Sequence, residues 1–386
     1  MVHYTLMQNV KIVAGPGTIA LAGEILSSDG YKKALIAYDK GIKSTGVIDK
    51  VIKSLAAYGM DYVEFDKVVP DPPADMIEEG YAVCKKEACD CVIGVGGGSA
   101  LDSAKGINLL RVNGGHILDY INHYKEGAKC PGCLNVPTTS GTGAELSSGI
   151  MVSDPRKNSK ECIEGEQYMS DYIVIDPELT VGMPKGLTTS TGIDAFSHAA
   201  EAYTGANANI LTDYLADAAM RSIVKYLPRA AADGSDMEAR TNMHVSASMG
   251  GILLKNCACQ LGHSVAHVLG GFYHVPHGIL CAYSLPVLME TVCDAVPEKV
   301  KNIGFILGAA FTGAETNAEI GKKTSDAYKK FAYETLHVPK VSETIKESVD
   351  KAALCDAILH EPLANFAPIQ VTKEIVADML DKVFEG

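Results

Sequence analysis

The spacing of apolar residues changes near residue 185, and this change constrains the fold more than any other feature of the chain. Before it, short apolar runs alternate with amphipathic stretches. The runs that predict strands are 33–39, 60–66, 90–98, 133–139 and 171–177, and the stretches that predict helices are 46–59 and 74–88. Alternation of this kind is typical of a parallel sheet covered by helices.

After residue 186 the pattern becomes helical. The segments 187–205, 210–232 and 238–260 have helical periodicity with few strand-like runs. We therefore predict two domains, an α/β domain over residues 1–185 and an all-helical domain over residues 186–386.

The composition excludes several classes of function. The chain has 386 residues and a formal net charge of −13, which argues against nucleic-acid binding. The sequence contains no apolar run long enough to span a bilayer, and its first residues lack the pattern of a signal peptide. We expect a cytoplasmic protein that does not bind membranes.

Eleven cysteines are spread along the chain without a framework pattern, and we expect them to be reduced thiols. Cys130 and Cys133 form a lone Cys-x-x-Cys motif. It is compatible with a redox pair or half of a zinc site. A turn between two elements is the favoured interpretation, because no second motif of this kind exists.

Four residues of the helical half are candidate ligands of one metal ion. Asp194 and His198 are four residues apart, which places both side chains on one face of a helix. His263 and His277 lie at either end of a later histidine-rich segment. Three imidazoles and one carboxylate suit a divalent ion such as Fe²⁺ or Zn²⁺. The competing interpretation is that these histidines are core residues.

A glycine-rich turn in the first half is a candidate phosphate site. Gly96, Gly97, Gly98 and Ser99 follow a predicted strand and precede a predicted helix. Glycines allow a close approach of the backbone, and the helix N-terminus favours a pyrophosphate. Lys105, further along this helix, either adds positive charge or is structural.

Two other features of the first half support a nucleotide. Asp39 ends a predicted strand, where a carboxylate accepts hydrogen bonds from ribose hydroxyls and repels the 2′-phosphate of NADP. PTTSGTGAE (137–145) gathers hydroxyl groups at the end of another strand, where they hold phosphate or sugar oxygens. The alternative for both is that they cap ordinary turns.

These stretches together resemble the iron-containing (group III) alcohol dehydrogenase family, over nearly the whole chain. Members of similar type include lactaldehyde reductases, 1,3-propanediol dehydrogenases and hydroxy-acid enzymes. The matching stretches are GGGSALDSAK (96–105), PTTSGTGAE (137–145), DPELTVGMP (176–184), TGIDAFSHAAEAY (191–203) and GHSVAHVLGGFYHVPHG (262–278).

The resemblance implies a Rossmann-like parallel-sheet domain followed by a helical-bundle domain, as in dehydroquinate synthases. It implies that the metal ligands are Asp194, His198, His263 and His277, that His267 is a further active-site histidine, and that His274 is not a ligand. The implied nucleotide contacts are Asp39, Gly97, Gly98, Ser99, Thr138, Thr139, Thr142, Lys160 and Leu179. Asp71 stands where the family usually has Asn.

The activity implied is NAD(H)- and metal-dependent interconversion of a short-chain primary alcohol, diol or hydroxy acid and its aldehyde, as an aldehyde reductase in fermentation. Fe²⁺ is the first choice of metal and Zn²⁺ the second, and the protein is expected to be a homodimer or larger homo-oligomer. The first alternative is a reductase of an acidic aldehyde, such as succinic semialdehyde or sulfoacetaldehyde. It requires that Lys255 faces the substrate and binds its acidic group. More remote are a glycerol dehydrogenase and a dehydroquinate-synthase-type lyase.

Overall fold

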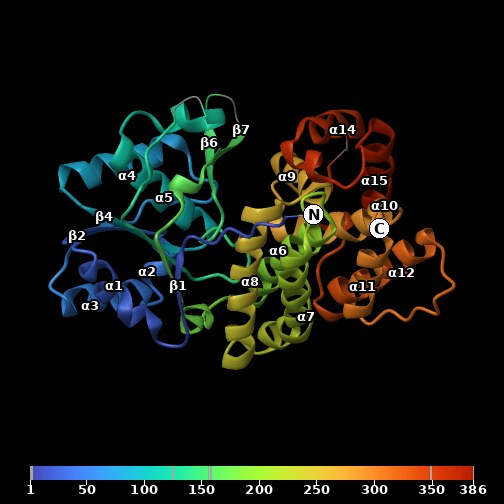
Figure 1. The fold of residues 1–386 in the computed structure, drawn as a ribbon, viewed down its shortest axis with the longest axis horizontal. Coiled ribbons are helices and arrows are strands. Elements are labelled where there is room, and N and C mark those ends of the chain that lie inside the picture. Colours follow the sequence, from blue (N-terminus) through green and yellow to red (C-terminus); the bar gives the residue numbers. More distant parts are fainter. Residues whose placement is uncertain (1–2, 124–125, 155, 157–158, 348–349, 386) are drawn as a thin grey trace. The chain divides into compact units, whose positions relative to one another are not determined.

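The computed structural model describes residues 3–123, 126–154, 156, 159–347 and 350–385. The chain divides into two compact units. One is Gln8–Met183, and the other is Pro184–Gly386 together with Met1–Met7. The first is the α/β unit and the second the helical unit (Figure 1).

A parallel sheet of six strands forms the centre of the α/β unit. Its strand order is β1-β8-β5-β4-β2-β3, with every pair parallel. The strands are β1 (Lys11–Ala14), β2 (Lys33–Ala37), β3 (Asp61–Phe65), β4 (Cys91–Gly96), β5 (Cys133–Pro137) and β8 (Tyr172–Ile175). The predicted Rossmann-like fold class is therefore confirmed.

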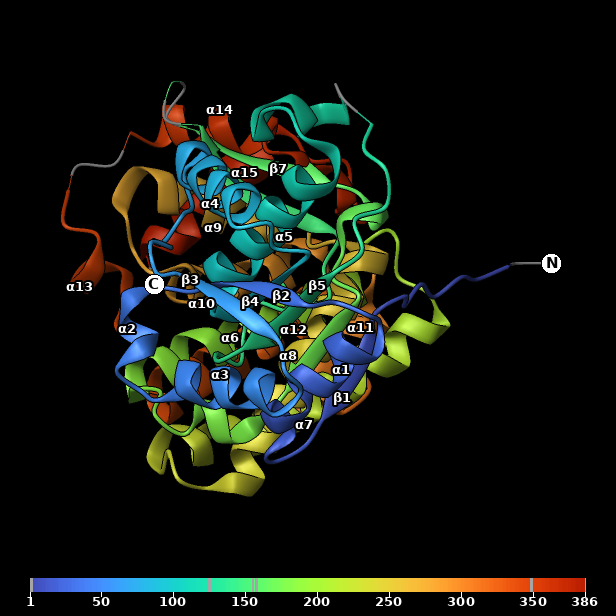
Figure 2. The same ribbon diagram turned by 90° about the vertical axis from the view of Figure 1, so that its left-hand side faces the viewer.

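Helices cover both faces of this sheet (Figure 2). Alternate residues of β2 face opposite layers: Ile36 packs with α3, whereas Leu35 packs with α4 and α5. Burial on both faces explains the continuous apolar runs of the strands. The helical segments of this unit are η1 (Thr18–Leu21), α1 (Ala22–Ser28), α2 (Lys40–Lys43), α3 (Val47–Ala57), α4 (Ala74–Lys86), α5 (Gly98–Asn113), η2 (Ile117–His123), η3 (Glu166–Tyr168) and η4 (Pro177–Thr180).

The strand order reverses between β2 and β4. The chain moves outward from β2 to β3 and then returns to place β4 on the other side of β2. In sheets of this type, ligands bind beyond the carboxyl ends of the strands at such a reversal. Asp39 follows β2, and Gly97 follows β4, so the candidate nucleotide residues lie at this edge.

Three strands were not expected from the sequence. β1 is short and mostly exposed at the edge of the sheet. β6 (Gly149–Asp154) and β7 (Ser159–Glu164) form a separate antiparallel pair. Both hairpin strands mix polar and apolar residues, so they lack the continuous apolar runs of the buried strands.

The helical unit is built around α6 (Lys185–Thr204), which packs against α7, α8 and α10 and is buried along most of its length after the first three residues. Most of its residues are small or apolar, and its polar side chains Asp194, His198 and Glu201 are buried. The other elements are α7 (Ile210–Ala232), α8 (Met237–Cys257), α9 (Leu261–Tyr273), α10 (His277–Val292), α11 (Pro297–Ile306), α12 (Asn317–Lys329), η5 (Lys330–Thr335), α13 (Val341–Thr344), α14 (Lys351–His360), η6 (Pro362–Phe366) and α15 (Lys373–Glu385).

The cysteines are free thiols, and all but Cys162 are buried. Burial raises the pKa of Cys130 to about 11 and that of Cys133 to about 12. Cys133 is the first residue of β5 and Cys130 lies three residues before it, so the Cys-x-x-Cys motif forms the connection into this strand. Among the described residues, no helix has the length and apolarity needed to cross a bilayer.

Candidate metal centre and nucleotide site

Helix α6 carries the first two candidate ligands. Asp194 and His198 are one turn apart on this helix, and both are buried. His198 Nε2 lies 3.3 Å from Asp194 Oδ1. The predicted placement of the two side chains on one helix face is therefore seen in the structure.

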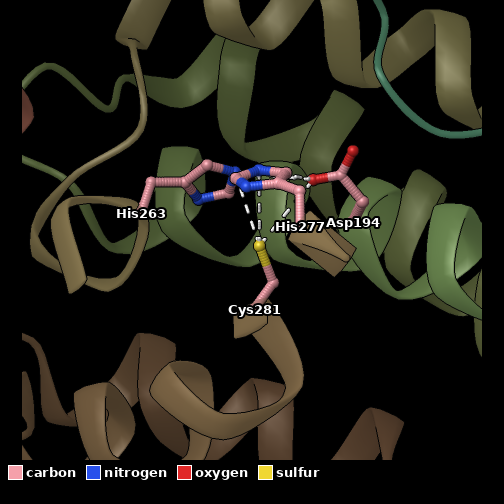
Figure 3. Close-up of side chains that lie close together, drawn as sticks. All are labelled: Asp194, His263, His277 and Cys281. Atoms are coloured by element: carbon pink, nitrogen blue, oxygen red, sulfur yellow. Dashed lines mark hydrogen bonds and ion pairs between the residues drawn. The ribbon is translucent and has the colours of Figure 1, made fainter. Parts of the chain in front are cut away.

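The other two candidates come from α9 and from the first residue of α10. His263 Nε2 lies 3.6 Å and His277 Nε2 3.4 Å from the same oxygen, Asp194 Oδ1. Figure 3 shows both imidazoles directed toward this carboxylate. The structure thus gathers three imidazole nitrogens around one buried carboxylate oxygen.

Close packing of α10 on α6 brings His277 to Asp194. Gly278 lies so near the preceding turn of α6 that a Cβ at this position would be 1.9 Å from the carbonyl oxygen of Ser190. Only glycine permits this approach.

Glu201 is a buried partner of the centre that the sequence analysis missed. Its Oε1 lies 2.6 Å from His263 Nδ1, and its Oε2 accepts hydrogen bonds from the backbone N–H groups of Gln260 and His263. A carboxylate on Nδ1 fixes the orientation of the ring and directs Nε2 to the centre. The available signal was its spacing, three residues after His198 on the same helix.

His267 has an equivalent carboxylate partner in Glu361. His267 Nδ1 lies 2.9 Å from Glu361 Oε1, and Ser264 donates to the other carboxylate oxygen at 2.6 Å. Burial lowers the pKa of His267 below its usual value, although Glu361 opposes this shift. Burial raises the pKa of Glu361, but the hydrogen bonds from His267 and Ser264 outweigh it, and the net pKa is lowered.

Cys281 is a second residue that the sequence analysis did not single out. It is buried one turn after His277, with Sγ 3.6 Å from His277 Nε2 (Figure 3). Cys257 ends α8, whereas Cys259 lies in the turn before α9 and has His198 and His263 within metal-ligand range.

The pKa values of the centre shift in different directions: those of Asp194 and His198 are lowered, whereas burial of His277 is outweighed by Cys281 and Asp194, which raise its pKa to about 10. Burial raises the pKa of Asp194, but the neighbouring histidines outweigh it and hold the pKa well below its usual range. Burial lowers the pKa of His198 to about 4, so this imidazole is neutral near pH 7, as a metal ligand must be.

His274 is exposed at the C-cap of α9, outside the metal-ligating groups of the described residues.

The glycine turn begins α5 in the α/β unit. Gly97 is the N-cap of this helix and provides no side-chain hydrogen bond to its first N–H groups. A Cβ on Gly98 would lie 3.1 Å from Thr142 Oγ1, and one on Gly97 would lie 3.5 Å from Thr139 Oγ1. The structure therefore brings the glycine turn, with Ser99, beside two of the predicted threonines.

Asp39 lies at the adjacent strand end. Its Oδ1 accepts a hydrogen bond of 2.9 Å from Gly41 and caps α2, which is the alternative considered from the sequence. Its Oδ2 faces Gly96, where a Cβ would lie 3.6 Å away. Capping therefore uses one carboxylate oxygen, and the other faces the glycine turn.

The remaining nucleotide candidates differ in their surroundings. Thr138 is buried, and its N–H donates to the carbonyl of Gly96 at 2.9 Å, next to the glycine turn. Leu179 is buried in the layer that contains α3. Lys160 is exposed on β7, where its Nζ lies 2.6 Å from Asp71 Oδ1. The structure joins Lys160 to Asp71 and not to the threonines.

Lys105 has a structural role. Its side chain is fully buried, with Nζ 2.9 Å from both the Ala144 carbonyl and Asp102 Oδ1, and it also donates to Gly149. These bonds tie α5 to the segment that follows the threonine turn. Of the two interpretations offered by the sequence, the structural one describes these contacts.

Two family models match the chain. The model of the iron-containing alcohol dehydrogenases covers residues 9–177, and the model of the C-terminal region of the Fe-containing alcohol dehydrogenase family covers residues 188–384.

Similar proteins include dehydrogenases of small alcohols. The chain is 38% identical over 306 residues to the NAD-dependent methanol dehydrogenase of Bacillus methanolicus, covering 79% of this chain and 80% of that protein. It is 35% identical over 313 residues to the 1,3-propanediol dehydrogenase of Klebsiella pneumoniae, covering 81% of each. The crystal structure of a 1,3-propanediol oxidoreductase superposes with a TM-score of 0.94 at 29% identity, covering 99% of this chain and 100% of that one.

Proposed function

Since this chain belongs to the iron-containing alcohol dehydrogenase family, we propose that it interconverts a short-chain primary alcohol or diol and its aldehyde with NAD(H), as an aldehyde reductase in fermentation. The enzyme is an NAD-dependent oxidoreductase that acts on CH–OH groups. One observation carries the proposal: three imidazole nitrogens lie 3.3–3.6 Å from one buried carboxylate oxygen.

This donor set fits a divalent metal. Asp194, His198, His263 and His277 would hold the ion, and Glu201 would orient His263. The lowered pKa of Asp194 supports the assignment, because a ligand carboxylate has to be ionised. When bound, Fe²⁺ or Zn²⁺ supplies a Lewis acid for the alcohol or carbonyl oxygen.

His267 exchanges the substrate proton in this proposal. Its Nδ1 is engaged by Glu361, which leaves Nε2 for proton transfer. The lowered pKa keeps the ring neutral near pH 7, so it accepts a proton during alcohol oxidation and returns one during aldehyde reduction.

The nucleotide is assigned to the carboxyl edge of the sheet. The N–H groups of Gly98 and Ser99 at the start of α5 would bind the pyrophosphate, and Thr138, Thr139 and Thr142 would line the turn. Asp39 would accept hydrogen bonds from the ribose and select NAD over NADP. Leu179 and Lys160 are the remaining proposed contacts. In the structure Lys160 forms an ion pair with Asp71.

A second candidate substrate is an acidic aldehyde such as succinic semialdehyde or sulfoacetaldehyde. In this case Lys255, which is half-buried in the last turn of α8, would hold the acid group of the substrate. The family match gives no separate support to a glycerol dehydrogenase or a dehydroquinate-synthase-type lyase, and we do not propose them.

A substrate panel tests the proposal. Oxidation of 1,3-propanediol, butanol, 4-hydroxybutyrate and isethionate, and reduction of the matching aldehydes, would be followed by the absorbance of NADH. We expect turnover of 1,3-propanediol and butanol, the two uncharged alcohols, and of their aldehydes. Turnover of only the two acids would support the second candidate, and turnover of none would contradict both.

Three further expectations stay proposals: domains at residues 1–185 and 186–386, a cytoplasmic location, and a homodimer or larger assembly. Light scattering of the purified protein tests the last, and a monomer at micromolar concentration would contradict it.

A further inference from the structure

Cys281 lies beside the space that a metal ion bound by the proposed ligands would occupy. It follows His277 by one turn of α10, so both side chains are on the same helix face. Its Sγ lies 3.6 Å from His277 Nε2, 3.8 Å from Asp194 Oδ1 and 3.9 Å from His263 Nε2. Figure 3 shows the sulfur pointing toward the space that the two imidazoles and the carboxylate also face.

These distances match the edges of a coordination shell. Bond lengths of about 2.0–2.1 Å to nitrogen or oxygen and about 2.3 Å to sulfur give tetrahedral edges of about 3.3 Å and about 3.6 Å. Asp194 Oδ1 lies 3.4 Å from His277 Nε2 and 3.6 Å from His263 Nε2. The distances from Cys281 Sγ to these three donor atoms are 3.6–3.9 Å. Four donor atoms therefore enclose a space of the size of one ion.

We propose that Cys281 coordinates the divalent metal through Sγ and completes a four-donor set with Asp194, His263 and His277, to which His198 adds a fifth donor. This inference rests on the metal centre of the proposed function. Coordination requires the thiolate, so binding releases the thiol proton to solvent. A soft thiolate ligand shifts the preference of the centre toward Zn²⁺ and away from Mn²⁺.

Other thiols nearby do not fit this position. Cys259 has His198 and His263 within ligand range, but it does not belong to the group that contains Asp194 and His277. Cys293 is buried in the apolar core at the C-cap of α10, twelve residues after Cys281. Both are matched controls, because each is a buried cysteine of the helical unit.

Cobalt substitution tests the ligand directly. The full chain would be loaded with one equivalent of Co²⁺, and the thiolate-to-cobalt charge-transfer absorption in the near ultraviolet would be recorded. We expect this band in the wild type, in Cys259→Ser and in Cys293→Ser, and its loss in Cys281→Ser with Co²⁺ still bound. A band that is absent from the wild type, or that is lost in Cys259→Ser instead, would overturn the proposal.

X-ray absorption of the wild-type zinc protein needs no variant. A single sulfur scatterer at about 2.3 Å supports coordination by Cys281, and a shell of nitrogen and oxygen alone overturns it. Zn²⁺ affinity of Cys281→Ser should fall by more than the roughly 10–100-fold that loss of an outer-shell partner costs. A nitrogen–oxygen shell with one metal per chain would leave the proposed function intact, whereas failure to bind any metal would overturn both.

Discussion

At the scale of single residues, the histidines around Asp194 have different partners, and this predicts different consequences of removing them. Glu201 directs His263 to the centre, whereas Glu361 holds His267. His263→Ala should lose metal and activity together. His267→Ala should keep one metal per chain and lose about 10²–10⁴-fold in kcat, the usual contribution of a general acid–base. Elemental analysis and NADH turnover of both variants measure the difference.

His274→Ala is the control for these variants, because this histidine is exposed at the C-cap of α9. It should keep metal and rate. Full metal occupancy and turnover in His263→Ala would contradict the ligand assignment.

The lowered pKa of His267 predicts the pH dependence of alcohol oxidation. The base must be neutral, so kcat/KM should hold below pH 6.5 and fall only as the pH drops through the lowered pKa. Between the lowered pKa and 6.5 the unfolded chain binds more protons at His267 than the folded chain does. The contribution of this group to the free energy of unfolding therefore decreases as the pH drops through this window.

Glu361→Gln serves as the comparison for the pH profile. The hydrogen bond to Glu361 raises the pKa of His267, so its loss should move the acid limb of kcat/KM to still lower pH. An acid limb that is unchanged in Glu361→Gln would show that another group titrates.

Asp39 sets the cofactor preference in this account. Its Oδ2 faces the glycine turn, where its charge would repel a 2′-phosphate. Asp39→Gly should raise kcat/KM for NADPH relative to NADH, and Asp39→Asn should do so while keeping the hydrogen bond to Gly41. The ratio of the two values in steady-state kinetics is the measurement, and an unchanged ratio in both variants would exclude this role.

Local spacing predicted only part of the metal centre. The four-residue interval between Asp194 and His198 indicates one helix face, and the same interval between His277 and Cys281 was available but was not used. The pairing of His267 with Glu361 was not predictable, because 94 residues separate them and only tertiary packing joins them.

At the scale of elements, the approach of α10 to α6 positions His277. Gly278→Ala would place a methyl group against the backbone of Ser190, so the helices must separate. We expect a loss of about 1–3 kcal/mol in the free energy of unfolding, typical of overpacking, together with weaker metal binding. Urea unfolding and metal titration measure the two effects.

Gly271→Ala is the matched control on α9, since a Cβ there meets no neighbour within 4 Å. It should be neutral or stabilise the helix by roughly 0.5–1 kcal/mol. If Gly278→Ala were as stable as this control and bound metal equally well, the packing argument would be wrong.

The strands and helices that bury continuous apolar faces were predictable, whereas the exposed ones were not. KALIA becomes β2, and its residues are buried almost throughout. KIVA becomes β1, whose place at the sheet edge depends on pairing with β8, more than 150 residues later. Hydrophobic spacing contains no information about such pairings.

At the scale of the whole molecule, the two candidate sites lie in different units. The metal candidates all belong to Pro184–Gly386, and the nucleotide candidates all belong to Gln8–Met183. Removal of the metal should therefore abolish turnover while NADH binding is retained. It should also lower the melting temperature, because a ligand of the folded state at 100 times its Kd contributes about 2.7 kcal/mol.

We propose that one protein-bound divalent metal makes this chain an NADH-linked aldehyde reductase. The most direct test is anaerobic addition of Fe²⁺ or Zn²⁺ to chelator-treated protein in the presence of NADH and 3-hydroxypropanal or butanal. We predict that NADH oxidation is absent before the addition and returns in proportion to metal, up to one equivalent per chain. Oxidation at the full rate in the metal-free protein would contradict the account.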